Sequence, residues 1–79
     1  MHVLRREDPA RNMARFYCLS LEPSLFGEIL LVTQWGRQGT YGQRRMMSFA
    51  DRKSASAALT RALSAKLRRG YEYRGFAPA

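Results

Sequence analysis

The chain has 79 residues, of which 46% are hydrophobic and 25% are charged. A chain this short supports one small hydrophobic core, so we expect a single domain over residues 1–79, with residues 75–79 as a frayed tail. Its 14 Lys and Arg residues outnumber its 6 Asp and Glu residues, for a formal net charge of +8. This surplus favours a polyanionic partner, nucleic acid ahead of an anionic membrane, and its plain alternative is a solvated basic surface.

The first half of the chain predicts two strands. Residues 3–6 form a short first strand that ends in a turn over residues 8–12. Residues 15–21 alternate between two faces and predict a longer strand, which ends before Pro23 because proline does not continue a ladder.

The middle of the chain predicts a hairpin. Residues 28–37 carry apolar side chains on both faces, which is typical of a central strand. Residues 39–42 form a glycine-containing turn that presents Tyr41, and residues 43–49 return antiparallel to the first strand of the hairpin.

From residue 51 the hydrophobic period changes from strand to helix. Residues 51–69 predict an alanine-rich helix with Asp51 as its N-cap and Gly70 at its C-terminal end. Lys66 falls inside the apolar side of this helix, which carries Ala55, Leu59, Ala62, Leu63 and Leu67. Residues 71–74 predict a last strand.

Groups that serve catalysis or metal binding are scattered along the sequence. His2 is the sole histidine, Cys18 has no activating partner nearby in sequence, and no two carboxylates form an acid–base pair. Gly36, Gly39 and Gly42 match neither pattern of phosphate-binding loops. We therefore expect no enzyme activity, no metal, no cofactor and no small-molecule substrate.

The opening residues and the single cysteine bear on location. Charge follows the first two apolar residues after His2, which is unlike a secretory signal, and no apolar run is long enough to span a membrane. We expect a cytoplasmic, reducing environment and no membrane partner.

Trp35 has two interpretations. It is either the largest core side chain or a stacking residue at the open end of its strand, beside Gly36 and close to Arg37 on the same face. Arg37 is likewise either a surface charge or a phosphate contact. Arg44 and Arg45 point to opposite faces of their strand, so only one of them can join a given surface.

Lys66 also keeps two interpretations at this point. Its aliphatic stem can cover apolar surface while the ammonium reaches water, or the ammonium can reach a phosphate beyond the sheet edge.

The motif residues resemble those of the WGR domain, and the chain is most similar to the short free-standing bacterial WGR proteins. The resemblance runs from Arg15 to Tyr71 and rests on Arg15-Phe16-Tyr17, Trp35-Gly36-Arg37-x-Gly39, Gly42-Gln43, Phe49, Ala55, Leu59, Leu63 and Lys66-x-x-x-Gly70-Tyr71. Two residues depart from the family pattern. Ala14 replaces a frequent asparagine, which puts a local polar contact in doubt, and Gln38 replaces an aliphatic residue, which suggests a more exposed turn.

The resemblance implies an α+β fold, a small antiparallel sheet of four to five strands with one α-helix packed on it. It also implies nucleic-acid binding, with DNA ahead of RNA, because the WGR domain of DNA-break-sensing poly(ADP-ribose) polymerases contacts DNA near a strand end. By position, Trp35 would stack and Arg37 would contact a phosphate or a partner. The full predicted binding set is Trp35, Gly36, Arg37, Tyr41, Gln43, Arg44, Arg45, Lys66, Arg68 and Arg69.

A second function class stays open beside DNA binding. The same motif could serve a protein-interaction adaptor that docks a partner enzyme or a second copy of the chain as a homodimer. The relay to a catalytic domain in the polymerases is not carried over, because this sequence contains no such domain.

Overall fold

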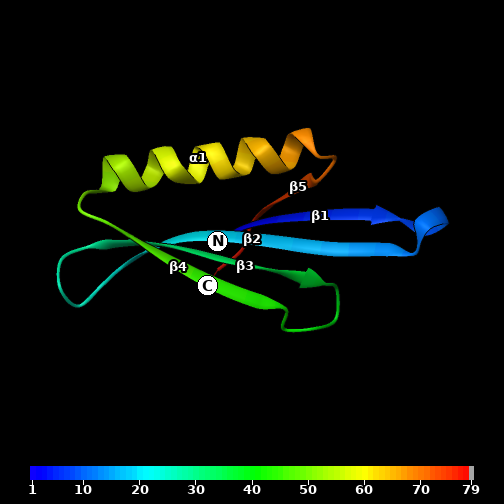
Figure 1. Cartoon of the computed structure of the whole chain (residues 1–79), viewed down its shortest axis with the longest axis horizontal. Helices are drawn as coiled ribbons and strands as arrows, with labels where there is room; N and C mark the ends of the chain where they lie inside the picture. The colour runs from blue at the N-terminus through cyan, green and yellow to red at the C-terminus, as the bar shows by residue number, and fades with distance from the viewer. Residues whose placement is uncertain (79) are drawn as a thin grey trace.

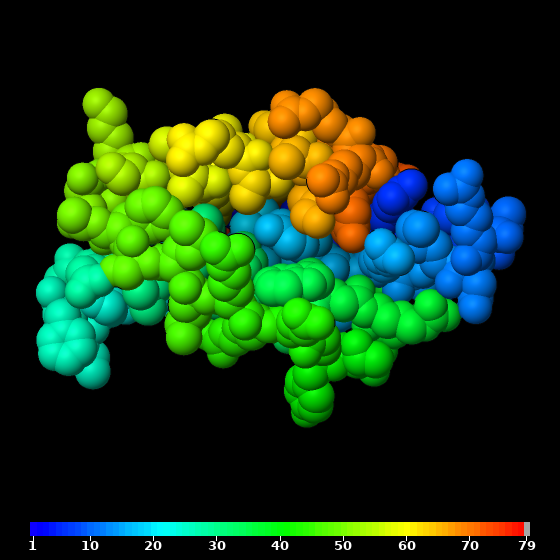
Figure 2. All heavy atoms as spheres, in the orientation of Figure 1, coloured from blue at the N-terminus to red at the C-terminus, as the bar shows by residue number. Residues whose placement is uncertain are grey.

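The computed structural model describes residues 1–78 as two layers, an antiparallel sheet and one helix that lies along its length (Figure 1). In the space-filling view, the helix, coloured yellow to orange, lies directly against the strands (Figure 2). The elements are β1 (His2–Asp8), the 3-10 helix η1 (Pro9–Arg11), β2 (Met13–Pro23), β3 (Ile29–Arg37), β4 (Gln43–Phe49), α1 (Arg52–Arg68) and β5 (Glu72–Phe76). The strand order is β4-β3-β2-β1-β5. α1 therefore connects one edge of the sheet to the other, and the predicted α+β fold is confirmed.

The register of the two longest strands defines the faces of the sheet. Tyr17 lies opposite Trp35, and Leu19 lies opposite Thr33. Directly opposite residues share a face, so these four side chains project to the same side. We call this side, which α1 covers in part, the helix face, and the other side the open face. Phe16 alternates with Tyr17 and therefore belongs to the open face.

The hydrophobic core lies between α1 and the helix face. Leu4 and Leu19 are fully buried at its centre, and Leu31 and Tyr71 are nearly so. The side chains of α1 that pack on this core are small or branched, namely Ala58, Leu59, Ala62 and Leu63, and Ala55 of the same helix is fully buried. Small residues let the helix approach the sheet closely, since each side chain that crosses the interface adds to the separation of the two layers.

Both ends of α1 carry the caps that the sequence predicts. The Asp51 carboxylate accepts a hydrogen bond from the Ser54 N–H at 2.7 Å, and this bond holds the pKa of Asp51 below its ordinary value. At the other end Gly70 has a φ of 92°. The Gly70 N–H donates to the Leu67 carbonyl and the Tyr71 N–H donates to the Lys66 carbonyl, which is the Schellman pattern. These bonds satisfy carbonyls of the last turn, and α1 ends at Arg68.

The β3–β4 hairpin depends on a close approach of two glycines. A Cβ placed on Gly36 would lie 2.7 Å from Gly42 Cα, and one placed on Gly42 would lie 2.0 Å from the Trp35 carbonyl oxygen. Gly42 also has a φ of 69°. Side chains at either position would force the backbone apart, so these two glycines set the geometry on either side of Trp35.

Three details differ from the sequence predictions. β1 and β2 extend beyond residues 3–6 and 15–21, because the two strands pair from His2 opposite Leu19 to Asp8 opposite Met13. β2 also continues to Pro23, which pairs with Ile29 at the last position of that ladder. Leu67 is 45% exposed rather than packed, because it lies beyond the edge of the core. Residues 75 and 76 belong to β5 and the Ala77 N–H donates to the Met1 carbonyl, so the expected frayed tail is paired there. Residue 79 lies outside the described residues.

Candidate nucleic-acid interface

Three segments lie toward the same end of the molecule: the β1–β2 turn, the β3–β4 hairpin turn and the C-terminal end of α1 (Figure 1). Trp35 lies on the helix face at this end, beyond the core, and is half-buried. Its ring centroid is 6.5 Å from that of Tyr17, with the planes tilted by 38°. The side chain is thus neither fully in the core nor free in solvent, and it leaves part of its surface open to a ligand.

Lys66 lies above the aromatic rings that line this end of the helix face. Its Nζ is 4.6 Å from the centroid of Tyr17 and 5.2 Å from that of Tyr71. Such positions attract an ammonium to the ring faces. Burial lowers the pKa of Lys66 below its ordinary value, and the positive charges of Arg69 and Arg15 lower it further. The ammonium therefore lies over the aromatic rings of this site, and its contact with a phosphate stays a prediction.

Two open hollows adjoin Trp35 on either side. One, of about 220 Å³, is lined by Tyr17, Thr33, Trp35, Arg45 and Lys66. The other, of about 380 Å³, is lined by Arg15, Trp35, Gly36, Arg37, Lys66 and Tyr71. Each hollow joins an indole wall to two or more cations, and Lys66 belongs to both. We call the residues of these two hollows the tryptophan site.

Arg37 has a structural partner as well as an exposed surface. Its Nη1 donates to the Asn12 carbonyl at 3.2 Å and its Nη2 donates to Asn12 Oδ1 at 3.3 Å. Asn12 itself has a φ of 52° at the end of the β1–β2 turn. A guanidinium has five N–H donors, so three remain for another acceptor. Arg37 therefore braces the turn and can still contact a phosphate.

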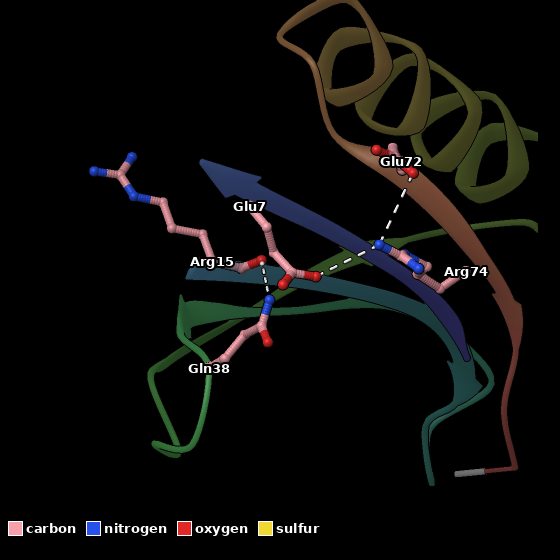
Figure 3. A network of polar contacts seen from close by, with 5 residues as sticks. All are labelled: Glu7, Arg15, Gln38, Glu72 and Arg74. Carbon is pink, nitrogen blue, oxygen red and sulfur yellow. Dashed lines mark hydrogen bonds and ion pairs between the residues drawn. The ribbon is translucent and has the colours of Figure 1, made fainter. Parts of the chain in front are cut away.

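The acidic side chains near this end pair away from the tryptophan site. Glu7 and Glu72 both contact Arg74 at the β1–β5 edge, with N···O distances of 3.5 and 3.8 Å (Figure 3). Arg15 accepts a hydrogen bond at its carbonyl from Gln38, while its side chain extends away from the acidic cluster (Figure 3). Across residues 1–78, no ion pair within 4.0 Å involves a cation of the tryptophan site. Among these residues, the cations of the tryptophan site are therefore not neutralised by a direct carboxylate contact.

Other sequence-predicted residues lie around this site or away from it. Gln43 is opposite Trp35 on β4 and shares its face. Tyr41 is 91% exposed at the hairpin tip, where its carbonyl accepts a hydrogen bond from Gln34 Nε2. Arg44 alternates with Arg45 and projects from the open face, where it lines a separate hollow. Arg44 therefore cannot contact a ligand together with Trp35. Strand alternation predicts that only one of the two arginines joins this surface, and that residue is Arg45.

The end of α1 contributes further positive charge. Arg68 and Arg69 are both exposed there. Arg69 is close enough to Lys66 to lower its pKa, so it adds to the potential of the tryptophan site. Cations at a helix C-terminus also interact favourably with the helix dipole, so both arginines have a role in stability as well.

Sequence reasoning missed Arg15, Tyr17 and Tyr71 as members of the site. Tyr71 belongs to the core, and Tyr17 packs against it. Burial raises the pKa of Tyr17 above its ordinary value. Strand alternation already places Arg15 on the face of Tyr17, but only the register with β3 brings Arg15 opposite Arg37.

Comparison with known proteins identifies the family. The model of the WGR domain matches residues 1–78. The chain belongs to the WGR-domain family. The WGR domain is a non-catalytic module, and in proteins similar to poly(ADP-ribose) polymerases it binds nucleic acid. The Trp-Gly-Arg tripeptide that names the family is Trp35-Gly36-Arg37 in this chain.

One curated relative comes from Sinorhizobium fredii (strain NBRC 101917 / NGR234), where it carries the description "Uncharacterized protein y4dW". It is 44% identical to this chain over 75 residues, which cover 95% of the chain and 37% of the relative. This WGR domain therefore spans little more than a third of that protein. Within residues 1–78, no helix has both the length and the apolar character needed to cross a membrane.

Proposed function

We propose that residues 1–79 form a single WGR domain that binds nucleic acid, DNA in preference to RNA, through the tryptophan site and without catalysis. One observation carries the proposal: four cations, Arg15, Arg37, Arg45 and Lys66, surround a half-buried tryptophan and have no carboxylate partner among the described residues. An aromatic plane beside unpaired cations suits a base or sugar together with its phosphates.

The two hollows suggest how a strand would lie. A base or sugar stacks on the open surface of Trp35, and its flanking phosphates lie toward Arg45 and Lys66 on one side and toward Arg15 and Arg37 on the other. Stacking on an aromatic side chain contributes about 1–3 kcal/mol per base. Phosphate contacts position a ligand but carry little sequence information, so we expect little base specificity. We also propose a cytoplasmic location, where the domain would meet nucleic acid.

Salt dependence tests this proposal. Four to six phosphate contacts, with Arg68 and Arg69 as the fifth and sixth cations, predict a slope of log K against log salt concentration of about −3 to −4 for single-stranded DNA. Affinity for a labelled single-stranded DNA of about 20 nucleotides then falls about 60- to 250-fold between about 50 and 200 mM salt. Arg45→Gln should lower the DNA affinity more than the charge-matched control Arg61→Gln, because only Arg45 lies in the site. Absence of binding at low salt would favour the adaptor function, in which the same motif docks a protein partner.

A further inference from the structure

The two edges of the sheet differ in how they resist the addition of another strand. β5 has five residues, its register with β1 shifts between His2 and Leu4, and Gly75 has a φ of 103°. Glu72 and Arg74 place charges on it. Short, irregular and charged strands are the means by which natural proteins close a sheet edge. β5 is therefore a protected edge.

β4, at the opposite edge, lacks most of this protection. Its seven residues pair with β3 in an unbroken register, from Gln43 opposite Trp35 to Phe49 opposite Ile29. As an outermost strand it pairs with one neighbour only, which leaves a row of backbone donors and acceptors on its outer side. No proline or glycine interrupts it. A straight edge strand of this kind is the surface that partners use for β-strand addition.

The side chains of β4 define the chemistry of such a partner. Met46 and Met47 are 58% and 42% exposed, on opposite faces, and methionine adapts its shape to an apolar neighbour. Arg44 and Arg45 precede them, and β4 contains no acidic residue. In an antiparallel pair, side chains directly opposite each other lie about 4.5–5.5 Å apart. The complementary strand therefore carries acidic residues opposite the arginines and apolar residues opposite the methionines.

We propose that β4 accepts an extended segment of a partner protein, acidic at one end and apolar at the other, as a sixth strand of the sheet. A second copy of the chain complements this edge less well, because each copy has a net charge of +8 and the two would repel each other. This function goes beyond nucleic-acid binding and depends mainly on the backbone of β4, although one of its side chains, Arg45, also lines the tryptophan site. Arg44 projects from the open face, outside the tryptophan site, so the two functions can be tested separately.

A heptapeptide titration tests the proposal. The peptide is acetylated and amidated, with glutamates opposite Arg44 and Arg45, valines opposite Met46 and Met47, and threonines elsewhere. Titrated into ¹⁵N-labelled protein, it should shift the amide resonances of residues 43–49 most. Arg44→Glu should weaken binding about fivefold, and a peptide with lysine opposite residue 44 should restore it. Arg61→Glu, which changes the same charge on the exposed side of α1, should leave the affinity within twofold.

Four outcomes would overturn the proposal. The first is that millimolar peptide shifts no amide resonance of residues 43–49, and the second is that Arg44→Glu and Arg61→Glu weaken peptide binding equally. The third is that the peptide shifts resonances around Trp35 most. The fourth is that the resonances of β4 shift with protein concentration when no peptide is present. The last result would assign the edge to a second copy. Binding of DNA by Arg44→Glu, measured on the same sample, shows whether the nucleic-acid function holds independently.

Discussion

Replacement of Gly42 by alanine should be much more destabilising than replacement of Gly39, although both glycines belong to the same turn. Both have positive φ, 69° and 88° respectively, which costs an alanine about 1–2 kcal/mol. Alanine also restricts the unfolded chain, which returns about 0.4–1 kcal/mol. At Gly39 the new Cβ meets no atom within 4 Å, so we expect a net loss of about 1 kcal/mol or less.

At Gly42 the new Cβ would collide with the backbone. It would lie 2.0 Å from the Trp35 carbonyl oxygen, 2.8 Å from the carbonyl carbon and 3.0 Å from the ring of Phe16. Forced backbone shifts in a packed site add about 1–3 kcal/mol, so the expected net loss is about 2–4 kcal/mol. Urea unfolding followed by the fluorescence of Trp35 measures both variants. Equal midpoints for Gly42→Ala and Gly39→Ala would refute the role assigned to this contact.

Three further predictions concern charged groups. The Ser54 N–H lowers the pKa of Asp51, so the stabilisation from this cap is complete above about pH 4 and is lost as the pH falls through the lowered value. The free energies of unfolding of Asp51→Ala and wild type, measured by circular dichroism, should therefore become equal in acid. Because the pKa of Lys66 is lowered, its ammonium deprotonates before that of an ordinary lysine as the pH rises toward 10; DNA affinity of wild type should fall there while that of Lys66→Arg holds. Arg37→Ala removes both the hydrogen bonds to Asn12 and a phosphate contact, and it should weaken DNA binding about fivefold or more. Asn12→Gly removes only the side-chain acceptor of Arg37 and suits a φ of 52°, so it should change DNA binding less than about twofold.

Local sequence patterns predict the elements well because their causes are local. Asp51 and Gly70 mark the ends of α1 through hydrogen bonds that span three to five residues. The alternation of residues 15–21 assigns Tyr17 and Phe16 to opposite faces, since the period of a strand is two. The family resemblance, which rests on specific residue spacing, is confirmed by the family match over residues 1–78.

The composition of the tryptophan site depends on contacts that no local pattern contains. Tyr17 reaches Trp35 only through the β2–β3 register, and Lys66 reaches Tyr17 only because α1 crosses back over the sheet. The bond from Arg37 to Asn12 joins residues 25 apart in sequence. Each depends on tertiary packing, so the sequence can name the candidates but cannot bring them together. The binding role of these residues stays a prediction.

The most direct test of the central claim is the effect of Trp35→Ala on two kinds of DNA at one salt concentration. If Trp35 stacks on an exposed base or sugar, the variant should lose about 1–3 kcal/mol of affinity for single-stranded or ended DNA, which is roughly a fivefold to 150-fold loss. A covalently closed duplex offers no unstacked base, so affinity for it should change less than threefold. Circular dichroism of the variant confirms that its fold is kept. Equal losses on the two DNAs would contradict stacking and return Trp35 to a purely structural role.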